Sequence, residues 1–256
     1  MKDAFASLEG NGVSVFYYDI IDSTNSQAKR ACLSGVSAPA LFVADSQSGG
    51  RGRMGRSFFS PPKTGIYLTV LIEAPCSSED SLKLTSAAAV AVRRAIFEIT
   101  GISTKIKWVN DIYLGNKKIA GILAESFPSP SSEKRYVALG VGINLFTEDF
   151  PDELKSIAGS LIRADGSSEH LRPALAARTA ELLLELLASS DLTSVMAEYR
   201  KHSAVLGKRI RFYENGTATD GIALSIDDQG ALLVRKDNGG TVALSSGEIS
   251  LRLSEQ

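Results

Sequence analysis

The sequence predicts an α+β protein, with a mixed β-sheet flanked by helices in its first part and a small β-barrel at its C-terminus. Runs rich in β-branched and aromatic residues alternate with Ala- and Leu-rich helical runs from residue 13 to residue 201. After Gly207 the pattern changes to short alternating strands broken by Asn-Gly, Asp-Gly and Gln-Gly turns. We therefore expect two domains, residues 1–206 and residues 207–256.

The bulk composition fits an ordinary globular chain of 256 residues, long enough for one large and one small domain. The formal net charge is −1, with 44% hydrophobic and 22% charged residues. A general nucleic-acid-binding protein needs a strong basic field, so this balance argues against that class. The sequence shows neither a membrane-length apolar segment nor a secretory signal pattern, and it predicts a cytoplasmic protein.

Five elements are expected in the first hundred residues. A helix begins at Ser23 or Thr24, either of which can cap it, and it runs to Gly35. A second helix covers residues 82–99, where apolar residues recur at helical spacing. Strands are expected in three runs rich in apolar residues, at 13–20, 40–46 and 65–73.

Further elements are expected in the rest of the chain. Residues 103–126 predict two or three short strands, with Gly115-Asn116 as a hairpin turn. A buried strand at 135–146 is followed by helices at about 168–189 and 191–201. The pattern of the last fifty or so residues, after Gly207, predicts five short strands, which is typical of a small barrel.

The stretch "SGGRGRMGRSFFSPP" at residues 48–62 contains the pattern G-x-G-x-x-G with three arginines. A dinucleotide-binding fold needs a helix after the third glycine, but two phenylalanines and two prolines follow instead. A P-loop needs Lys-Ser or Lys-Thr after its last glycine, and that is absent as well. The remaining interpretations are a flexible loop whose guanidinium groups bind an anion, or a solvated basic loop.

Two other fragments, "KWVND" at 107–111 and "GVGIN" at 140–144, fall at successive expected strand ends. If "KWVND" is a strand, Lys107 and Val109 share one face while Trp108 and Asn110 share the other. Each fragment alone fits an edge strand or a tightly packed strand equally well. Together with the glycine-arginine stretch, they predict a cleft lined by strand ends.

The chain resembles biotin protein ligases from about Tyr17 to Arg252. The resemblance is carried by "DSTNSQAK", "DSQSGGRGRMGRSFFSP", "KWVNDIYLGNKKIAGILAE", "GVGINLF" and "GEISLR", in that order and at similar spacing. It implies a class II synthetase-like catalytic domain followed by an SH3-like barrel. Since the chain starts close to the first catalytic strand, we expect the monofunctional type, without an N-terminal DNA-binding domain and without DNA binding.

The resemblance also implies an activity. Such ligases use ATP to form biotinyl-5′-adenylate, with Mg²⁺, and transfer biotin to one lysine of a biotin carboxyl carrier protein or domain. Family members often pair through sheet edges, so a homodimer is consistent with the family. The alternatives are a lipoate–protein ligase, a non-catalytic binding or regulatory protein, and a barrel that binds nucleic acid; the "GRGRMG" stretch and the C-terminal barrel favour biotin.

The family motifs map onto individual residues of this sequence. Catalytic roles are implied for Lys118, which would bridge the biotin carboxylate and the α-phosphate, and for Arg53 and Asp111, the latter also a candidate Mg²⁺ ligand. The implied biotin-binding residues are Ser23, Thr24, Asn25, Gln47, Gly50, Arg51, Arg53, Lys118 and Gly121. The implied nucleotide-binding residues are Arg51, Arg53, Arg56, Phe58, Asn110 and Asn144.

Two positions depart from the family pattern. Val109 stands where the family commonly has proline, and a strand tolerates valine well. Phe58 stands where the family commonly has tryptophan, and it retains an aromatic face for stacking on adenine, with less area and no indole N–H.

Overall fold

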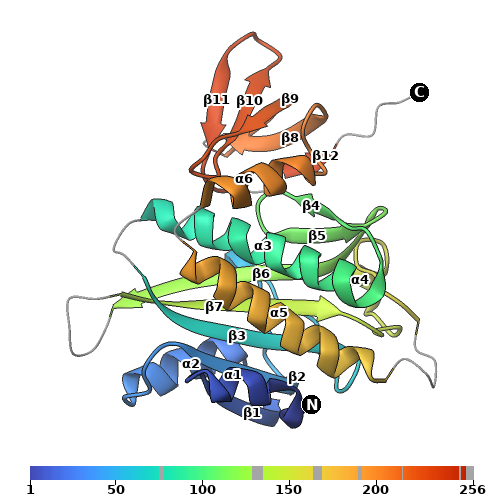
Figure 1. Ribbon diagram of the computed structural model, residues 1–256. Helices are drawn as coiled ribbons and strands as arrows, with labels where there is room; N and C mark the ends of the chain where they lie inside the picture. Colours follow the sequence, from blue (N-terminus) through green and yellow to red (C-terminus); the bar gives the residue numbers. More distant parts are fainter. Residues whose placement is uncertain are drawn as a thin grey trace.

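Two β-sheets and the helices packed around them make up the protein, seen here in a computed structural model (Figure 1). The structure describes residues 1–74, 78–128, 135–163, 169–189, 192–214, 216–247 and 249–251. The larger sheet has seven strands in the order β1-β2-β3-β7-β6-β5-β4, and the smaller has five in the order β11-β10-β9-β8-β12. The predicted α+β class, with a mixed sheet first and a small β unit last, is confirmed.

The large sheet is mixed because β1 and β2 run parallel while every other neighbouring pair in it is antiparallel. β3 and β7 form its centre, and ten residue pairs join them. Its strands are β1 (Ser14–Ile21), β2 (Ala40–Gln47), β3 (Gly65–Ala74), β4 (Lys105–Lys107), β5 (Asp111–Leu114), β6 (Lys117–Pro128) and β7 (Arg135–Asn144).

Helices cover both faces of this sheet. Successive side chains of a strand point to opposite faces, and apolar side chains on both faces are buried against helices. In β2, Leu41 and Val43 join the main core with α3 and α5, whereas Ala40 and Phe42 pack with α2 on the other face. Ser23 caps α2 as expected, and its side chain accepts a hydrogen bond from Ser26 N. The helices are η1 (Lys2–Phe5), α1 (Ala6–Gly10), α2 (Thr24–Leu33), η2 (Arg53–Gly55), α3 (Ser78–Thr100), α4 (Asp152–Lys155), α5 (Leu171–Ala188) and α6 (Leu192–Lys201).

The C-terminal sheet is antiparallel throughout, in agreement with the expected SH3-like barrel. Its strands are β8 (Arg209–Glu214), β9 (Thr217–Ile226), β10 (Leu232–Lys236), β11 (Thr241–Leu244) and β12 (Ile249–Leu251). The domain boundary expected after residue 206 stays a prediction, and it falls between α6 and β8. Of the quoted motif "GEISLR", Glu248 and Arg252 lie outside the described residues.

The "KWVND" segment corrects one expectation. It is not a continuous strand, because β4 ends at Lys107, residues 108–110 form a turn, and β5 begins at Asp111. The chain must reverse there for Lys107 to pair with Asp111, so the predicted alternation is wrong: Trp108 and Val109 are both buried.

Hydrogen bonds hold this turn from several sides. The indole Nε1 of Trp108 donates to Gly230 O of the C-terminal unit at 2.9 Å. The hydroxyl of Tyr199 donates to Val109 O at 2.9 Å, and Asn110 Nδ2 donates to Ile122 O at 2.8 Å. Asn110 is therefore fixed beside β6, where the cleft lies.

The lengths of most elements agree with the sequence patterns. Sequence reasoning did not predict η1, α1, η2 or α4, which are all five residues long or shorter. In the part of the chain that the structure describes, none of the helices combines the length and the apolar character needed to cross a bilayer.

A largely buried ion pair holds the ends of β2 and β3 together. Arg172, in the first turn of α5, places Nη1 2.7 Å from Asp45 Oδ1 and donates from Nε to Gly65 O at 2.7 Å. Burial opposes ionisation of Asp45, but hydrogen bonds from Tyr17 and Arg172 and the positive charge of Arg172 outweigh it, so the pKa of Asp45 is lowered. The connection from residue 48 to residue 64 therefore leaves and re-enters the sheet at a fixed place.

We predict that Arg172→Met lowers the free energy of unfolding by about 3 kcal/mol at pH 7, because it leaves the Asp45 carboxylate buried without its partner. A carboxyl with a lowered pKa stabilises the fold above the unfolded-state pKa of about 4 and loses that contribution as the pH falls through its folded pKa. The difference between variant and wild type should therefore shrink at acid pH. Urea unfolding at pH 7 and pH 3 measures it, and an equal difference at both values would contradict the assignment.

Candidate active site

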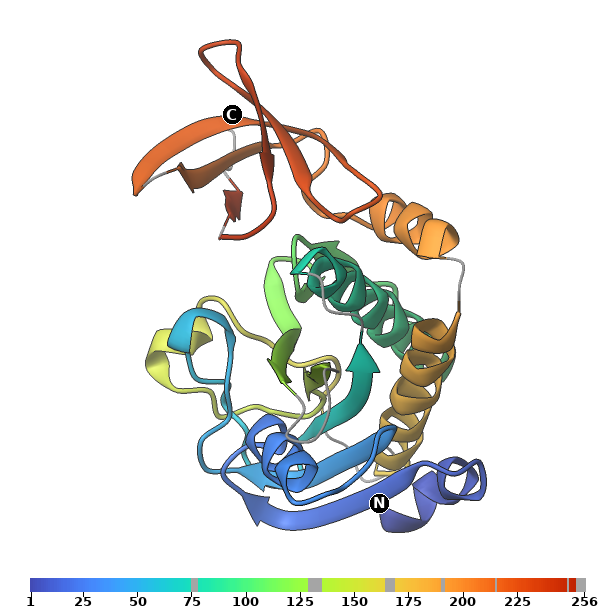
Figure 2. The ribbon, with the colours of Figure 1, turned by 90° about the vertical axis from the view of Figure 1, so that its left-hand side faces the viewer.

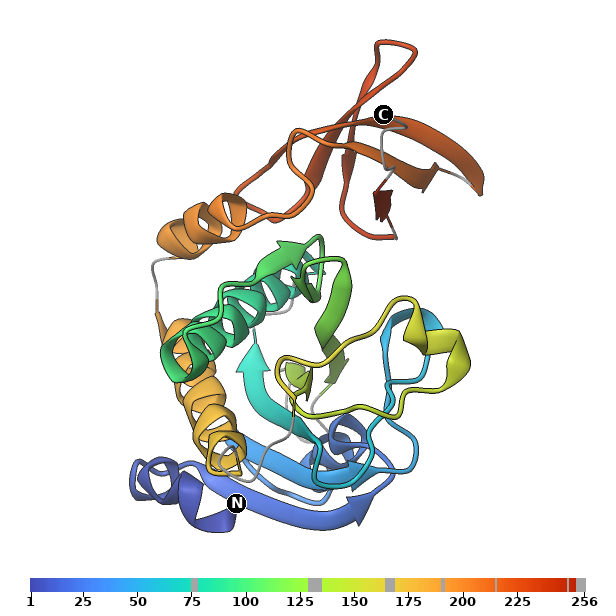
Figure 3. The same cartoon turned by 90° about the vertical axis from the view of Figure 1, so that its right-hand side faces the viewer.

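The glycine-arginine stretch forms a lid loop, defined here as residues 48–62, on the side of the molecule opposite α5 (Figures 2 and 3). It folds back on itself: Phe58 N donates to Gly50 O at 2.9 Å, and Gly52 N donates to Arg56 O at 2.7 Å. Gly55 has φ +75°, a conformation that glycine adopts at little cost. Residues 56–64, all described, contain no helix, so the exclusion of a dinucleotide-binding fingerprint is confirmed.

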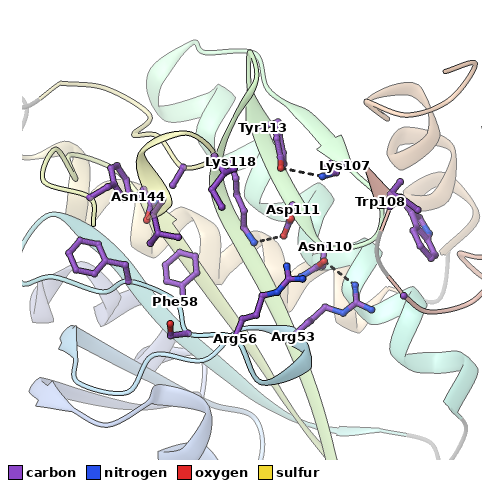
Figure 4. A pocket seen from close by; sticks show the side chains of 18 residues that line it. Arg53, Arg56, Phe58, Lys107, Trp108, Asn110, Asp111, Tyr113, Lys118 and Asn144 are labelled. Atoms are coloured by element: carbon purple, nitrogen blue, oxygen red, sulfur yellow. Dashed lines mark hydrogen bonds and ion pairs between the residues drawn. The ribbon is translucent and has the colours of Figure 1, made fainter. Parts of the chain in front are cut away.

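Beneath the lid loop lie two adjoining pockets. The inner pocket lies over β6, β7 and the start of α2, and it is lined by Ser23, Thr24, Asn25, Gln47, Arg51, Gly121, Gly140 and Gly142 among others. The outer pocket, of about 290 Å³, is lined by Arg56, Lys107, Trp108, Asp111, Tyr113, Asn144 and Phe150 among others (Figure 4). Four residues line both pockets: Arg53, Phe58, Asn110 and Lys118.

The junction of the two pockets carries paired charges from neighbouring strands. Lys118 of β6 places Nζ 2.6 Å from Asp111 Oδ1 of β5. From the lid loop, Arg53 Nη1 donates to Asn110 Oδ1 at 3.2 Å. Two cations are thus held by polar partners where the pockets meet (Figure 4).

Phe58 forms a partition between the pockets. Its ring lies so close to Gly142 that a Cβ there would stand 2.5 Å from Phe58 Cε1, and a Cβ at Gly121 would stand 3.5 Å from Cε2. The ring also meets Tyr67 edge to face, with centroids 6.4 Å apart. Glycine at position 142 is therefore what allows the lid loop to lie down on the sheet.

One side of the inner pocket is a chain of polar side chains. Gln47 Oε1 accepts hydrogen bonds from Thr24 N at 2.9 Å and from Thr24 Oγ1 at 3.1 Å. Gln47 Nε2 donates to Ser60 Oγ at 2.9 Å, and that hydroxyl donates to Phe58 O at 2.9 Å. The end of the lid loop is thereby tied to the start of α2.

Asn25, which follows Thr24 at the start of α2, is buried. Its Oδ1 accepts a hydrogen bond from Thr69 Oγ1 at 2.6 Å, and its Nδ2 donates to Glu125 Oε2 at 2.9 Å and to Leu123 O at 3.2 Å. A Cβ at Gly140 would come within 2.1 Å of Asn25 Oδ1, so glycine is required there. Since both amide hydrogens of Asn25 are engaged within the protein, its remaining capacity toward a ligand is as an acceptor.

The expected site residues lie together. Ser23, Thr24, Asn25, Gln47, Arg51 and Gly121 line the inner pocket, Arg56, Asp111 and Asn144 line the outer pocket, and Arg53, Phe58, Asn110 and Lys118 line both. Gly50 lies at the base of the lid loop, where a Cβ would stand 2.3 Å from Phe58 O. Arg51 lines the inner pocket and pairs with Glu125 at 2.9 Å. Lys117 points away, donating from Nζ to Lys155 O at 2.6 Å.

Sequence reasoning missed several residues of the site. Lys107 and Tyr113 line the outer pocket, with Lys107 Nζ 3.4 Å from the Tyr113 hydroxyl and 5.2 Å from its ring centroid. Burial, aided by the charge of Asp111, raises the pKa of Tyr113 to about 12, so it stays a neutral phenol. The strand period could have found Tyr113, because it lies two residues after Asp111 on one face of β5. No sequence pattern indicated Thr69 or Glu125.

Two pockets meet at a lysine–aspartate pair under an arginine-bearing loop, an arrangement with room for two ligands placed end to end, as in a ligase. The model of the biotin/lipoate A/B protein ligase family matches residues 17–144, and that of the biotin protein ligase C-terminal domain matches residues 205–252. The chain belongs to the biotin/lipoate A/B protein ligase family.

Individual relatives agree with this assignment. The chain is 32% identical to the bifunctional ligase/repressor BirA of Bacillus subtilis, over 94% of this chain and 74% of that protein. It is 33% identical to the biotin–[acetyl-CoA-carboxylase] ligase of Mycobacterium tuberculosis, over 89% of this chain and 85% of that protein. The structure of biotin protein ligase from Aquifex aeolicus in complex with biotin and ATP matches with a TM-score of 0.71 and 27% identity, over 94% of this chain and 99% of the other.

We predict that Thr69→Val lowers the free energy of unfolding by about 1–2 kcal/mol, because it leaves the buried Asn25 Oδ1 without its donor while conserving volume. Thr217→Val, at an exposed position that starts β9, serves as the matched control and should change stability little. Urea unfolding measures both variants. Equal stability of the two would show that the Thr69 hydrogen bond contributes nothing.

Proposed function

We propose that the protein activates biotin with ATP to form biotinyl-5′-adenylate and then transfers biotin to a specific lysine of a biotin carboxyl carrier protein or domain. The observation that carries this proposal is the sharing of Lys118 and Arg53 by two adjoining pockets. A carboxylate entering from one side and a phosphate entering from the other would meet between these cations. The names of the relatives, biotin–[acetyl-CoA-carboxylase] ligases among them, support the same reaction.

The inner pocket is assigned to biotin. Its polar wall suits the ureido ring, which needs both donors and acceptors: Ser23, Thr24 and Gln47 offer hydroxyl and amide groups, and Asn25 offers an acceptor. Gly50 and Gly121 leave room at the base of the lid loop and on β6. The biotin carboxylate then points at Lys118, at the junction.

The outer pocket is assigned to ATP. Arg53 and Arg56 neutralise phosphate oxygens with bidentate donors, and Phe58 offers an aromatic face to the adenine. Asn110 and Asn144 supply polar contacts to the nucleotide. We assign Arg51 to the biotin side alone, because its guanidinium pairs with Glu125 and does not line the outer pocket.

The chemistry follows from these positions. A biotin carboxylate oxygen attacks the α-phosphorus, the bond from that phosphorus to the bridging oxygen breaks, and pyrophosphate leaves with the electron pair. Lys118 and Arg53 stabilise the negative charge that grows on the transferring phosphoryl group. In the second step the acceptor lysine amine attacks the acyl carbon and AMP leaves, with Asp111 orienting the incoming amine. The folded lid loop keeps water from the adenylate.

Mg²⁺ fits the outer pocket as a partner of the phosphates. The described residues hold no group of three or more His, Cys, Asp or Glu side chains suited to a metal, but Mg²⁺ bound to a triphosphate needs only one or two protein carboxylates. Asp111, which lines the outer pocket, is the carboxylate we assign. The ion would supply neutralisation of phosphate charge.

The location and assembly of the enzyme complete the proposal. Because ATP and the carboxylase acceptor are cytoplasmic substrates, we place the reaction in the cytoplasm. A homodimer would need an accessible sheet edge, and β1 forms an edge of the large sheet with the Ile20 side chain exposed. Light scattering in solution tests this assembly.

We predict that Lys118→Ala lowers the rate of biotinyl-adenylate formation roughly 10³-fold, because it removes the cation shared by the two pockets. The matched control is Lys117→Ala, an adjacent lysine that points away and whose loss should leave the rate unchanged. Radiolabelled biotin with ATP and Mg²⁺ measures adenylate formation directly. Similar rates in the two variants would remove Lys118 from the mechanism.

We also predict that the protein forms an adenylate from biotin and not from lipoate under the same conditions. The same assay with each radiolabelled acid separates the two substrates. Adenylate formation from lipoate alone would overturn the proposed function in favour of a lipoate–protein ligase.

A further inference from the structure

Polar side chains within hydrogen-bond distance of one another lie around the inner pocket and lead back to the lid loop from which they start. This row of side chains begins at Ser60 of the lid loop and continues through Gln47 to Thr24. Thr69 is the next member, because its Oγ1 lies 2.8 Å from Thr24 Oγ1 and 2.6 Å from Asn25 Oδ1. From Asn25 the row of hydrogen-bonded side chains continues to Glu125 of β6.

Glu125 completes this circuit. Its two carboxylate oxygens serve different partners: Oε2 accepts from Asn25 Nδ2 at 2.9 Å, and Oε1 lies 2.9 Å from Nη2 of Arg51. Arg51 belongs to the lid loop, so the circuit begins and ends on the same loop. The Glu125 side chain is 30% exposed and that of Arg51 is 52% exposed, so solvent screens the pair in part and its contribution is modest.

We propose that Glu125 is a positioning residue that latches the lid loop over the inner pocket, by binding Arg51 while it fixes the Asn25 carboxamide. The inference rests on the proposed function, since the pocket that the latch closes is the one assigned to biotin. Glu125 does not line either pocket, so it acts through Arg51 and Asn25 and not by contact with a ligand.

Two of the three arginines of the lid loop thereby have separate tasks. Arg53 hydrogen-bonds to Asn110 at the junction, where charge develops during phosphoryl transfer. Arg51 is neutralised by Glu125 beyond the inner pocket and lies away from the triphosphate side. Loss of the latch should therefore affect retention of biotin and of the adenylate more than it affects ATP or the chemical step.

A double-mutant cycle tests this coupling. Glu125→Gln keeps an oxygen for Asn25 but removes the charge opposite Arg51, and Arg51→Ala removes the partner itself. We expect each single variant to lose preformed biotinyl-adenylate about fivefold faster than wild type when no acceptor is present. The double variant should be no faster than the singles, because all three have lost the same pair.

Kinetic constants separate a latch from a general structural role. The KM for biotin should rise a few-fold in each variant, while the KM for ATP and the thermal midpoint stay at wild-type values. Glu9→Gln, at an exposed carboxylate on α1, is the matched control and should behave as wild type. Wild-type retention of the adenylate, multiplicative effects in the double variant, or an equal rise in the KM for ATP would overturn the proposal.

Proteolysis of the ligand-free protein tests the latch independently of the reaction. Chymotrypsin can cut after Phe58 and Phe59, which lie in the lid loop and remain in every variant. Both Glu125→Gln and Arg51→Ala should be cut there about fivefold faster than wild type. Equal cutting rates in the variants and the wild type would contradict the latch. Absence of adenylate in the activity assay would instead overturn the proposed function, so the two failures can be told apart.

Discussion

Repulsion between a carboxylate and a triphosphate is the constraint around which this site is organised. Two unit charges of the same sign 4 Å apart repel by about 4 kcal/mol at an effective dielectric constant of 20, so they meet only where cations stand between them. Lys118 and Arg53 line both pockets at their boundary, and in the proposed reaction they are the cations between the two anions. Asp111 holds Lys118 and Asn110 holds Arg53. Both cations are therefore already in place before the ligands bind.

The sheet order explains how these partners come together. β5 and β6 are neighbours, which sets Lys118 beside Asp111, and the turn before β5 points Asn110 at the cleft. The lid loop can lie on this surface because glycines at 121 and 142 leave room for the Phe58 ring. The Arg172–Asp45 pair, neither residue of which lines the two pockets, fixes the place where the lid loop joins the sheet. Fold stability and site geometry are therefore coupled through one connection.

Local patterns predicted most elements because their causes are local. Strand period, helix caps and hairpin glycines act within a few residues, and they located β1 to β3, α2 and the Gly115-Asn116 turn. The turn at Trp108–Asn110 escaped, since it is held by Tyr199, Gly230 and Ile122, partners that no local pattern connects to it. Glu125 and the placement of Arg51 escaped for the same reason: their partners lie 74 or more residues apart or depend on how the lid loop folds.

A crystal structure with a nonhydrolysable analogue of biotinyl-5′-adenylate tests the central claim most directly. The account predicts the biotin ring in the inner pocket beside Thr24 and Gln47, the adenosine in the outer pocket beside Asn144, and the acyl-phosphate linkage within hydrogen-bond distance of Lys118 Nζ. Both ends of the analogue on one side of Phe58, or a linkage beyond the reach of Lys118, would contradict it.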